Sequence, residues 1–189
     1  MHRFLNFLAA AALVLSLAAP AALSQAQAPA APSVYKAEIT RSIEDAEKKL
    51  VALAEKFPQE KYGWHPEGAR TTSEVFMHIA AGNYGYSTLM GAPRPEGKTS
   101  AVLSKITDKA QVVQVLKDSF AYIKTAVANV PDVEKAIKLY GHDSSVREAM
   151  LVAATHCHEH MGQLIAYARV NGIVPPWTEE AAARAPAKN

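Results

Sequence analysis

The sequence predicts an all-α protein that folds as a single four-helix bundle. Four segments of about 20 residues carry apolar side chains at helical spacing, whereas no stretch of useful length alternates apolar and polar residues as a half-buried strand does. Prolines and glycines separate the four segments. Each amphipathic helix needs a partner for its apolar face, and four such helices satisfy one another in one bundle.

The first helix is expected over residues 34–57, and Pro58 ends it. Residues 58–70 are rich in proline and glycine, so they predict an irregular connection with Tyr62 and Trp64 as packing anchors. The predicted inner face of this helix consists of Ile39, Ile43, Ala46, Leu50, Leu53 and Phe57.

The second helix is expected to start at Thr71, because Thr71 and Glu74 have the spacing of a capping box. It ends before Gly91, and Gly82 and Gly85 weaken it locally. Its predicted inner face consists of Val75, His78, Ile79, Gly82, Tyr86 and Leu89.

The third helix is expected to be capped by Thr107 and closed by Pro131. The polar connection that follows includes Leu139 and Tyr140, which favour either a brief strand or a loop. The predicted inner face of the third helix consists of Val112, Val115, Leu116, Phe120, Ile123 and Val127.

The fourth helix is expected to begin at a second capping box, Ser145 with Glu148, and to run to about Gly172. The pair Pro175-Pro176 prevents its continuation. Its predicted inner face consists of Ala149, Val152, His156, His160, Gln163 and Tyr167.

Residues 1–28 have the pattern of a secretory signal peptide. An apolar run over Phe4–Leu17 follows Arg3, is shorter than the roughly 20 residues of a membrane-spanning helix, and leads into small residues. We expect cleavage near Ala26 or Ala28, and export to the periplasm or out of the cell without a stable membrane anchor. An uncleaved N-terminal anchor is the alternative.

The remainder of the chain divides into a short tether, one domain over residues 34–177, and a tail over 178–189 that is expected to be flexible. Arg3 is the only charged residue among the first 28, so their removal changes the formal net charge from +2 to +1. This near-neutral charge argues against a nucleic-acid partner. Cys157 is the only cysteine, which excludes an internal disulfide and an N-terminal lipid anchor.

Two histidines on the fourth helix have the spacing of metal ligands. His156 and His160 are four residues apart, so their side chains lie about 40° apart on one face, one turn above the other. His158 points nearly the opposite way. Any third ligand therefore has to come from another part of the fold.

His78 is the candidate third ligand, because it interrupts the apolar face of the second helix. A buried imidazole without a partner costs roughly 1–3 kcal/mol, and one divalent metal ion would satisfy all three histidines. Three imidazoles leave at least one coordination position open, as in catalytic zinc sites, and nickel, cobalt, iron and manganese also accept such ligands. Hydrogen-bonded core histidines without a metal are the alternative.

Several known metal motifs are excluded by their spacing. A zincin needs His-Glu-x-x-His, whereas His158-Glu159 is followed at once by His160. A ferritin-like di-iron bundle needs Glu-x-x-His, and neither Glu74 nor Glu159 has a histidine three residues later. Attachment of c-type haem needs a second cysteine, which the chain lacks.

Two neighbours on the fourth helix are candidates for supporting roles. Gln163 lies about 20° from His156 in projection, so it could orient a ligand or bind a metal-held water, or simply pin a neighbouring helix. Glu159 lies about 60° from His156 and could act as an acid or base, although a solvated carboxylate is the commoner case. Cys157 is expected to be a small buried apolar residue. His65 and His142, in predicted loops, are left out of the site.

These residues resemble the DinB/YfiT-like superfamily. The resemblance lies in a histidine on the second helix, in His-x-x-x-His-x-Gly-Gln at positions 156–163, and in the helix exit Val-Asn-Gly-Ile-Val-Pro-Pro. Residues 62–70 and 74–84 are also similar to the loop and second helix of that family. The chain departs from many relatives at Met161, where they carry arginine.

The resemblance implies a four-helix bundle, often a homodimer, with a divalent metal on His78, His156 and His160. Better-understood relatives resemble thiol S-transferases and a thiol-dependent isomerase that use cytosolic thiols such as bacillithiol or mycothiol, so a small thiol is the implied partner. Three functions remain open: a metal-dependent thiol transferase or hydrolase, a non-catalytic metal-binding or stress-related protein of the envelope, and a structural interaction module without metal. Catalytic residues beyond the ligands are not identified.

Overall fold

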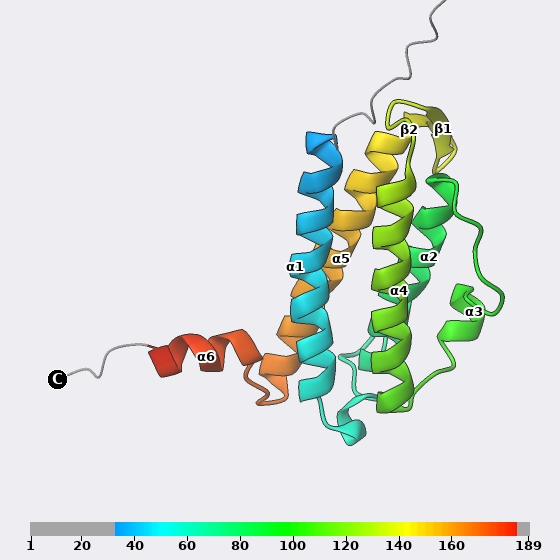
Figure 1. The fold of residues 1–189 in the computed structure, drawn as a ribbon. Helices are drawn as coiled ribbons and strands as arrows, with labels where there is room; N and C mark the ends of the chain where they lie inside the picture. The colour runs from blue at the N-terminus through cyan, green and yellow to red at the C-terminus, as the bar shows by residue number, and fades with distance from the viewer. Residues whose placement is uncertain (1–32, 185–189) are drawn as a thin grey trace, which may run out of the picture. The chain divides into compact units, whose positions relative to one another are not determined.

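The computed structural model describes residues 33–184 and confirms the predicted all-α four-helix bundle (Figure 1). The predicted signal peptide lies outside the described residues and stays a prediction. Four long helices build the bundle: α1 (Val34–Lys56), α2 (Thr72–Leu89), α4 (Lys109–Asn129) and α5 (Val146–Val170). Among the described residues, none of the helices has the length and apolar character needed to cross a membrane.

The four helices stand at the corners of a square in which α1 and α2 are diagonal. Helix α1 packs mainly against α4 and α5, and α2 packs against the same two helices (Figure 1). Helices α2 and α5 run in opposite directions. The hydrogen bond from the Tyr167 hydroxyl, near the end of α5, to the Arg70 carbonyl, just before α2, shows that the end of one helix lies beside the start of the other. This antiparallel α2–α5 pair carries the three candidate ligands.

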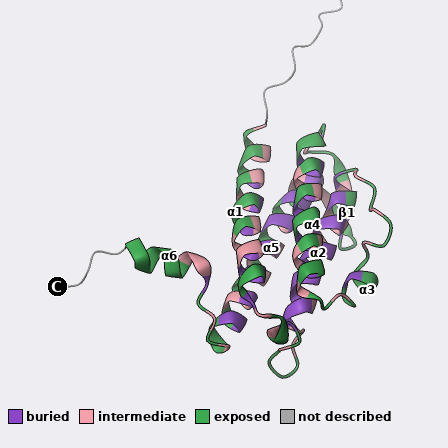
Figure 2. Ribbon diagram, turned by 60° about the horizontal axis from the view of Figure 1, so that its bottom comes forward, coloured by how far each residue is buried: buried purple, intermediate pink, exposed green. Residues whose placement is uncertain are grey.

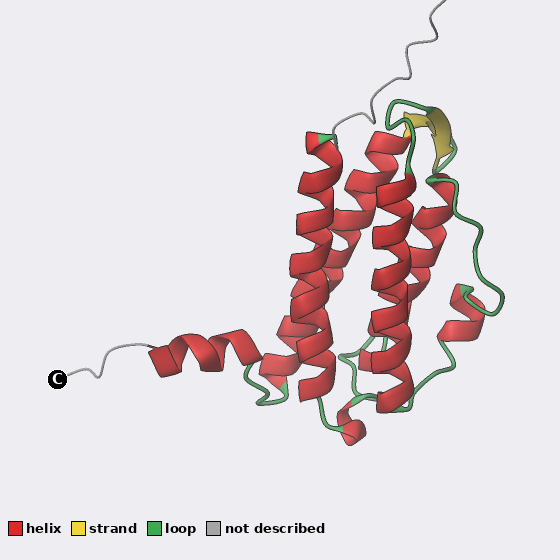
Figure 3. Cartoon of the chain, viewed as in Figure 1, coloured by secondary structure: helices red, strands yellow, loops and turns green. Residues whose placement is uncertain are grey.

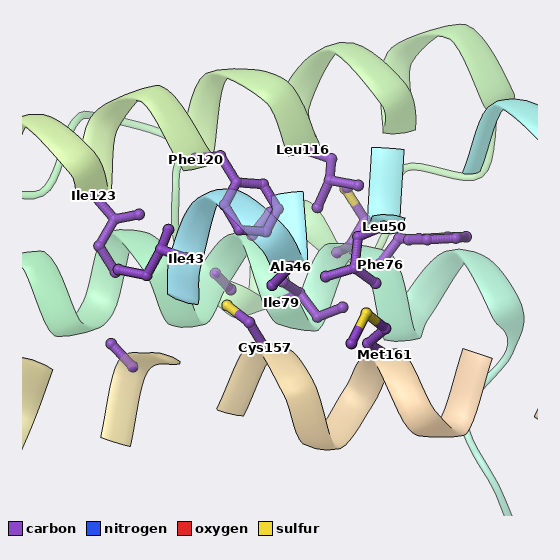
Figure 4. Packing of buried hydrophobic residues seen from close by; sticks show 14 of the residues in the cluster. Ile43, Ala46, Leu50, Phe76, Ile79, Leu116, Phe120, Ile123, Cys157 and Met161 are labelled. Carbon is purple, nitrogen blue, oxygen red and sulfur yellow. The ribbon is translucent and has the colours of Figure 1, made fainter. Parts of the chain in front are cut away.

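The core confirms the inner faces predicted for α1 and α4. All six residues predicted for α1 are buried, as are all those predicted for α4 except the half-buried Val115. Figure 4 shows side chains from all four helices meeting, with Phe120 of α4 above Ile79 of α2 and Cys157 of α5. A small polar group is embedded in this core, where Asn83 donates to Ser119 at 3.1 Å and the Cys157 thiol lies 3.4 Å from the Asn83 oxygen.

The buried face of α5 differs from the predicted one. Val152, His156, His160 and Gln163 are half-buried, whereas the face turned to the core is small and apolar and includes Ala149, Ala153, Ala154, Cys157, Met161, Leu164 and Ala168. The predicted inner face of α5 is therefore rotated around the helix from the observed buried face by roughly one residue, or about 100°. As a result the histidines lie at the edge of the bundle and not in its middle.

The start of α2 is as predicted, and the starts of α4 and α5 differ in detail. The Thr71 hydroxyl accepts from the Glu74 N–H while the Glu74 carboxylate accepts from the Thr71 N–H, which completes the capping box. Helix α4 is capped by Asp108 and not by Thr107, because the Asp108 carboxylate accepts the Gln111 N–H at 2.9 Å.

Ser145 caps α5 by accepting the Glu148 N–H, but only half of the predicted box forms. The Glu148 carboxylate accepts from the Ser144 hydroxyl instead of from the Ser145 N–H. A serine one position earlier thus takes the partner that the capping-box pattern assigns to the helix start.

The connections contain short elements, which Figure 3 distinguishes by colour. The first connection holds a 3₁₀ turn, η1 (Gln59–Lys61), and the second holds α3 (Ser100–Leu103), which was not predicted. Strands β1 (Ala136–Leu139) and β2 (His142–Ser145) form an antiparallel hairpin. The brief strand considered for Leu139 exists, and Tyr140 and Gly141 form its two-residue turn with φ of 50° and 88°, the positive values that such turns require.

Helix α6 (Pro176–Arg184) occupies most of the segment for which no regular structure was expected beyond Thr178. Pro176 begins it, as proline often begins a helix, so the Pro-Pro pair ends one helix and permits the next. Figure 2 shows α6 largely exposed, and the ion pair of Lys56 with Glu179 at 2.9 Å connects it to the end of α1.

Candidate metal centre

The fold brings His78, His156 and His160 together, although 78 residues separate the first two. One ring nitrogen from each lies within 4.8 Å of the others. The ring centroids are 4.6–4.9 Å apart, and Nε2 of His156 lies 3.1 Å from Nε2 of His78. The three residues are half-buried to buried, and their ring nitrogens form one cluster between α2 and α5.

A chain of hydrogen bonds fixes the orientation of His160. Nδ1 of His160 lies 2.9 Å from Oε1 of Gln163, whose amide nitrogen donates to the Tyr167 hydroxyl at 2.9 Å, and that hydroxyl donates to the Arg70 carbonyl at 3.1 Å. An amide oxygen only accepts, so Nδ1 of His160 carries the hydrogen and Nε2 keeps its lone pair. This is the arrangement by which outer residues orient a metal-binding histidine.

The electrostatic surroundings keep the other two imidazoles neutral. Burial, followed by the neighbouring His160, His78 and Arg70, lowers the pKa of His156 from 6.5 to about 4. Burial, His160 and Arg70 also lower the pKa of His78. A neutral imidazole is the form that binds a metal ion, so neither residue has to release a proton near pH 7.

Gly82 provides the space that the His156 ring occupies. A Cβ atom at position 82 would lie 2.6 Å from Cε1 and 2.9 Å from Nδ1 of His156, which is closer than real contacts allow. Gly82 lies one turn after His78 on α2, so the two rings approach each other across a bare helix surface. The sequence shows Gly82 only as a weak point of the helix, and its role becomes clear from the packing.

The donor set fits a divalent metal ion. Two nitrogens bound at about 2.0–2.1 Å to one ion lie roughly 2.8–3.4 Å apart for angles between about 90° and 109°, and the two Nε2 atoms of His78 and His156 are 3.1 Å apart. A hydrogen bond between the His78 and His156 rings would instead satisfy only their two Nε2 atoms and would leave Nε2 of His160 without a partner. Nδ1 of His156 is buried with no hydrogen-bond partner among the described residues, and it stays unpaired whether Nε2 contacts His78 or a metal ion.

The other histidines among residues 33–184 lie away from the cluster. Nε2 of His158 lies 3.1 Å from the Ser42 hydroxyl of α1. His65 contacts the Pro66 carbonyl in the first connection, and His142 lies in β2.

Among the other candidate residues, Gln163 belongs to the centre through His160. Glu159 is exposed and, within residues 33–184, forms no hydrogen bond to the histidines, so only its charge acts on His78. Cys157 is buried in the core, and burial raises the pKa of its thiol to about 12, which makes it inert.

One aromatic ring lies against the cluster, and an aromatic pair lies beyond Gln163. The Tyr86 ring lies 5.5 Å from the His156 ring, and Trp64 packs edge-on against Tyr167 at 5.2 Å. Tyr84 is buried in the core beside Tyr122. No local sequence pattern indicates that the Tyr167 hydroxyl and the Arg70 carbonyl extend the His160 chain of hydrogen bonds, because that contact joins residues 97 positions apart.

A family model described as the DinB superfamily matches residues 42–164. The chain belongs to the DinB superfamily. The match spans His78, His156, His160 and Gln163, so the whole cluster lies within the DinB region, and Tyr167 lies just beyond it. A search of curated proteins gave no match to this DinB protein.

Proposed function

We propose that this DinB protein binds one divalent metal ion through His78, His156 and His160. The observation that carries the proposal is the cluster itself, in which one nitrogen of each ring lies within 4.8 Å of the others. The lowered pKa values of His78 and His156 support it, because both imidazoles are then available as neutral ligands. Imidazole ligands suit zinc, nickel and iron, and they do not exclude cobalt or manganese.

The bound ion would supply Lewis acidity, which lowers the pKa of a thiol or a water molecule at the remaining coordination position. The chain contributes the geometry around it. Gln163 holds His160 with Nε2 free, and Gly82 lets the His156 ring approach α2. The Tyr86 ring lies 5.5 Å from the His156 ring and borders the site on one side. This arrangement supports a metal-dependent transferase or hydrolase that acts on a small molecule, with a thiol as the proposed nucleophile.

We further propose that the protein acts outside the cytoplasm. The support is the N-terminal sequence, where Phe4–Leu17 is apolar and small residues follow it. Its thiol partner would then come from the envelope or the surroundings. Immunoblotting of periplasmic and cytosolic fractions tests the location, and a full-length band confined to the cytosol would contradict export.

The metal assignment is tested by elemental analysis of the purified protein, comparing the wild type with His156→Ala and His158→Ala. We expect close to one equivalent of a divalent metal in the wild type and in His158→Ala, because His158 bonds to Ser42 away from the cluster. His156→Ala should lose most of it. Retention of stoichiometric metal by His156→Ala would show that the ion is held by other residues.

A further inference from the structure

A cavity of about 290 Å³ lies beside the candidate metal centre. Its walls come from the second half of α2, from the loop after α2, and from the β-hairpin. The residues that matter for its chemistry are Gly82, Gly85, Tyr86, Arg94, Lys138 and Tyr140. The volume is at the lower end of the roughly 300–1,000 Å³ found for ligand pockets, so the cavity suits a small group and not a large ligand.

The cavity continues the surface of the metal centre along one face of α2. His78, Gly82 and Gly85 lie within about 60° of one another around the helix, at successive levels. Gly82 belongs to both places, since it lines the cavity and its Cα packs under the His156 ring. Tyr86 is also shared, because it lines the cavity and its ring lies 5.5 Å from His156.

Two cations line this cavity. The Arg94 guanidinium lies against the α2 backbone, where a Cβ on Gly85 would be 3.0 Å from one of its nitrogens. Within residues 33–184, Arg94 forms no ion pair. Lys138 pairs with Asp143 at 2.7 Å, but both side chains are largely exposed, and such a pair is worth only about 0–1 kcal/mol.

The uncharged lining adds hydrogen-bond donors. The hydroxyls of Tyr86 and Tyr140 are 2.5 Å apart, so one donates to the other and the second hydrogen remains free for a ligand. No aspartate or glutamate in the described part of the chain lines the cavity. A guanidinium, an ammonium and a phenol hydroxyl around one small space form a set of donors suited to an oxyanion.

We propose that this cavity binds the oxyanion end, a carboxylate or phosphate, of a small acidic substrate whose other end reaches the histidine cluster. Arg94 and Lys138 hold the anion, while Gly82 leaves the path along α2 open toward His156. The reacting group, a thiol in the proposed function, would lie about one to two helical turns, or roughly 5–10 Å, from the anion. The substrate class rests on the proposed function, whereas the anion site itself can be tested without metal.

The anion site is tested by calorimetric titration of inorganic phosphate into the purified, metal-free protein. We expect binding in the wild type, weakened roughly tenfold or more in Arg94→Gln with Lys138→Gln, because charge-assisted hydrogen bonds are lost. Arg169→Gln is the matched control, since Arg169 is an exposed arginine outside this cavity. Equal phosphate affinity in the double variant, or no phosphate binding by the wild type, would overturn the proposal.

A second titration separates this inference from the proposed function. Cobalt-loaded protein is titrated with 6-mercaptohexanoate and with the uncharged 6-mercaptohexanol, and the sulfur-to-cobalt absorption band is followed. The wild type should prefer the carboxylate by roughly tenfold, and the double variant should lose this preference without a change for the alcohol. An unchanged preference in the variant would contradict the substrate class. If neither thiol binds while phosphate still binds, the proposed thiol function is contradicted and the anion site is retained.

Discussion

Gly82 determines how closely His156 can approach His78. The His156 ring fills the place where any other residue at position 82 would put its Cβ. Glycine costs up to about 1 kcal/mol relative to alanine inside a helix, so its presence in the middle of α2 runs against helix propensity. The packing explains why glycine is present despite this cost, because the absence of a side chain at position 82 lets the His156 ring lie against α2 beside His78.

We expect Gly82→Ala to weaken metal binding by about tenfold or more, because the new methyl group displaces the His156 ring from its position near His78. The metal affinity is measured by competition with a chromophoric chelator. Gly162→Ala is the control, since nothing lies within 4 Å of a Cβ at this exposed position of α5. It should retain the metal and gain about 0.5–1 kcal/mol in the free energy of unfolding. Unchanged affinity in Gly82→Ala would show that the ring does not need this space.

The lowered pKa of His156 predicts a pH dependence for the metal-free protein. In the unfolded chain His156 binds a proton below about 6.5, whereas in the folded chain it stays neutral down to about 4. Between these values the unfolded state binds more protons, so the free energy of unfolding falls as the pH falls. The loss starts below pH 6.5 and is complete below about pH 4.

Urea unfolding of wild type and His156→Asn, with a chelator present, measures this effect. The variant should lose less stability than the wild type between pH 7 and pH 4, because His156 no longer contributes. Its remaining slope includes His78, whose pKa is also lowered. Parallel curves for the two proteins would mean that the folded state protonates His156 as readily as the unfolded chain does.

At the scale of single helices, α2 depends on its first turn to present His78. The capping box of Thr71 and Glu74 satisfies N–H groups that α2 would otherwise leave without partners. Thr71→Ala should lower the free energy of unfolding by about 1 kcal/mol, as measured by urea denaturation. Ser33→Ala is the matched comparison, because Ser33 caps α1 without a side-chain hydrogen bond, and it should change stability by less than about 0.5 kcal/mol. Similar losses in the two variants would contradict a specific role for the box.

The sequence predicted the helices better than their orientation. The stripe of α1 was correct because large aliphatic residues alternate there with charges, so only one face can be buried. In α5 the core face consists mostly of alanines with Cys157, and small residues leave the direction of burial weakly marked. The predicted face of α5 was therefore centred on the histidines, which lie at the edge of the bundle. The pair of His156 and His160 was still predicted to share one face, because the i, i+4 spacing does not depend on where the core lies.

Other features depended on contacts that sequence spacing does not reveal. Asp108 replaced Thr107 as the cap of α4 because either residue suits the position, and only backbone geometry decides between them. The hydrogen bond from Tyr167 to Arg70 and the approach of Arg94 to Gly85 both join different elements. Local sequence patterns thus predict the four long helices and the pair of His156 and His160, whereas the surroundings of the three histidines follow from the packing of α2 against α5.

At the scale of the whole molecule, a bound ion would join two helices that are distant in sequence. His78 lies on α2, His156 and His160 lie on α5, and α4 and the hairpin come between them along the chain. The unfolded chain has no such preformed cluster, so metal binding should favour the folded state by mass action. The three ligands come from only two helices, and the stabilisation therefore acts on the α2–α5 contact.

We expect added zinc at 100 times its dissociation constant to raise the free energy of unfolding by about 2.7 kcal/mol, and the melting temperature with it. Differential scanning calorimetry of the chelator-treated protein, with and without zinc, measures the shift. His158→Ala should show the full shift, because His158 contacts α1 through Ser42 and not the cluster. In His78→Ala the shift should largely vanish, since the remaining pair belongs to α5 alone and no longer connects two helices. A full shift in His78→Ala would mean that zinc stabilises the bundle without joining α2 to α5.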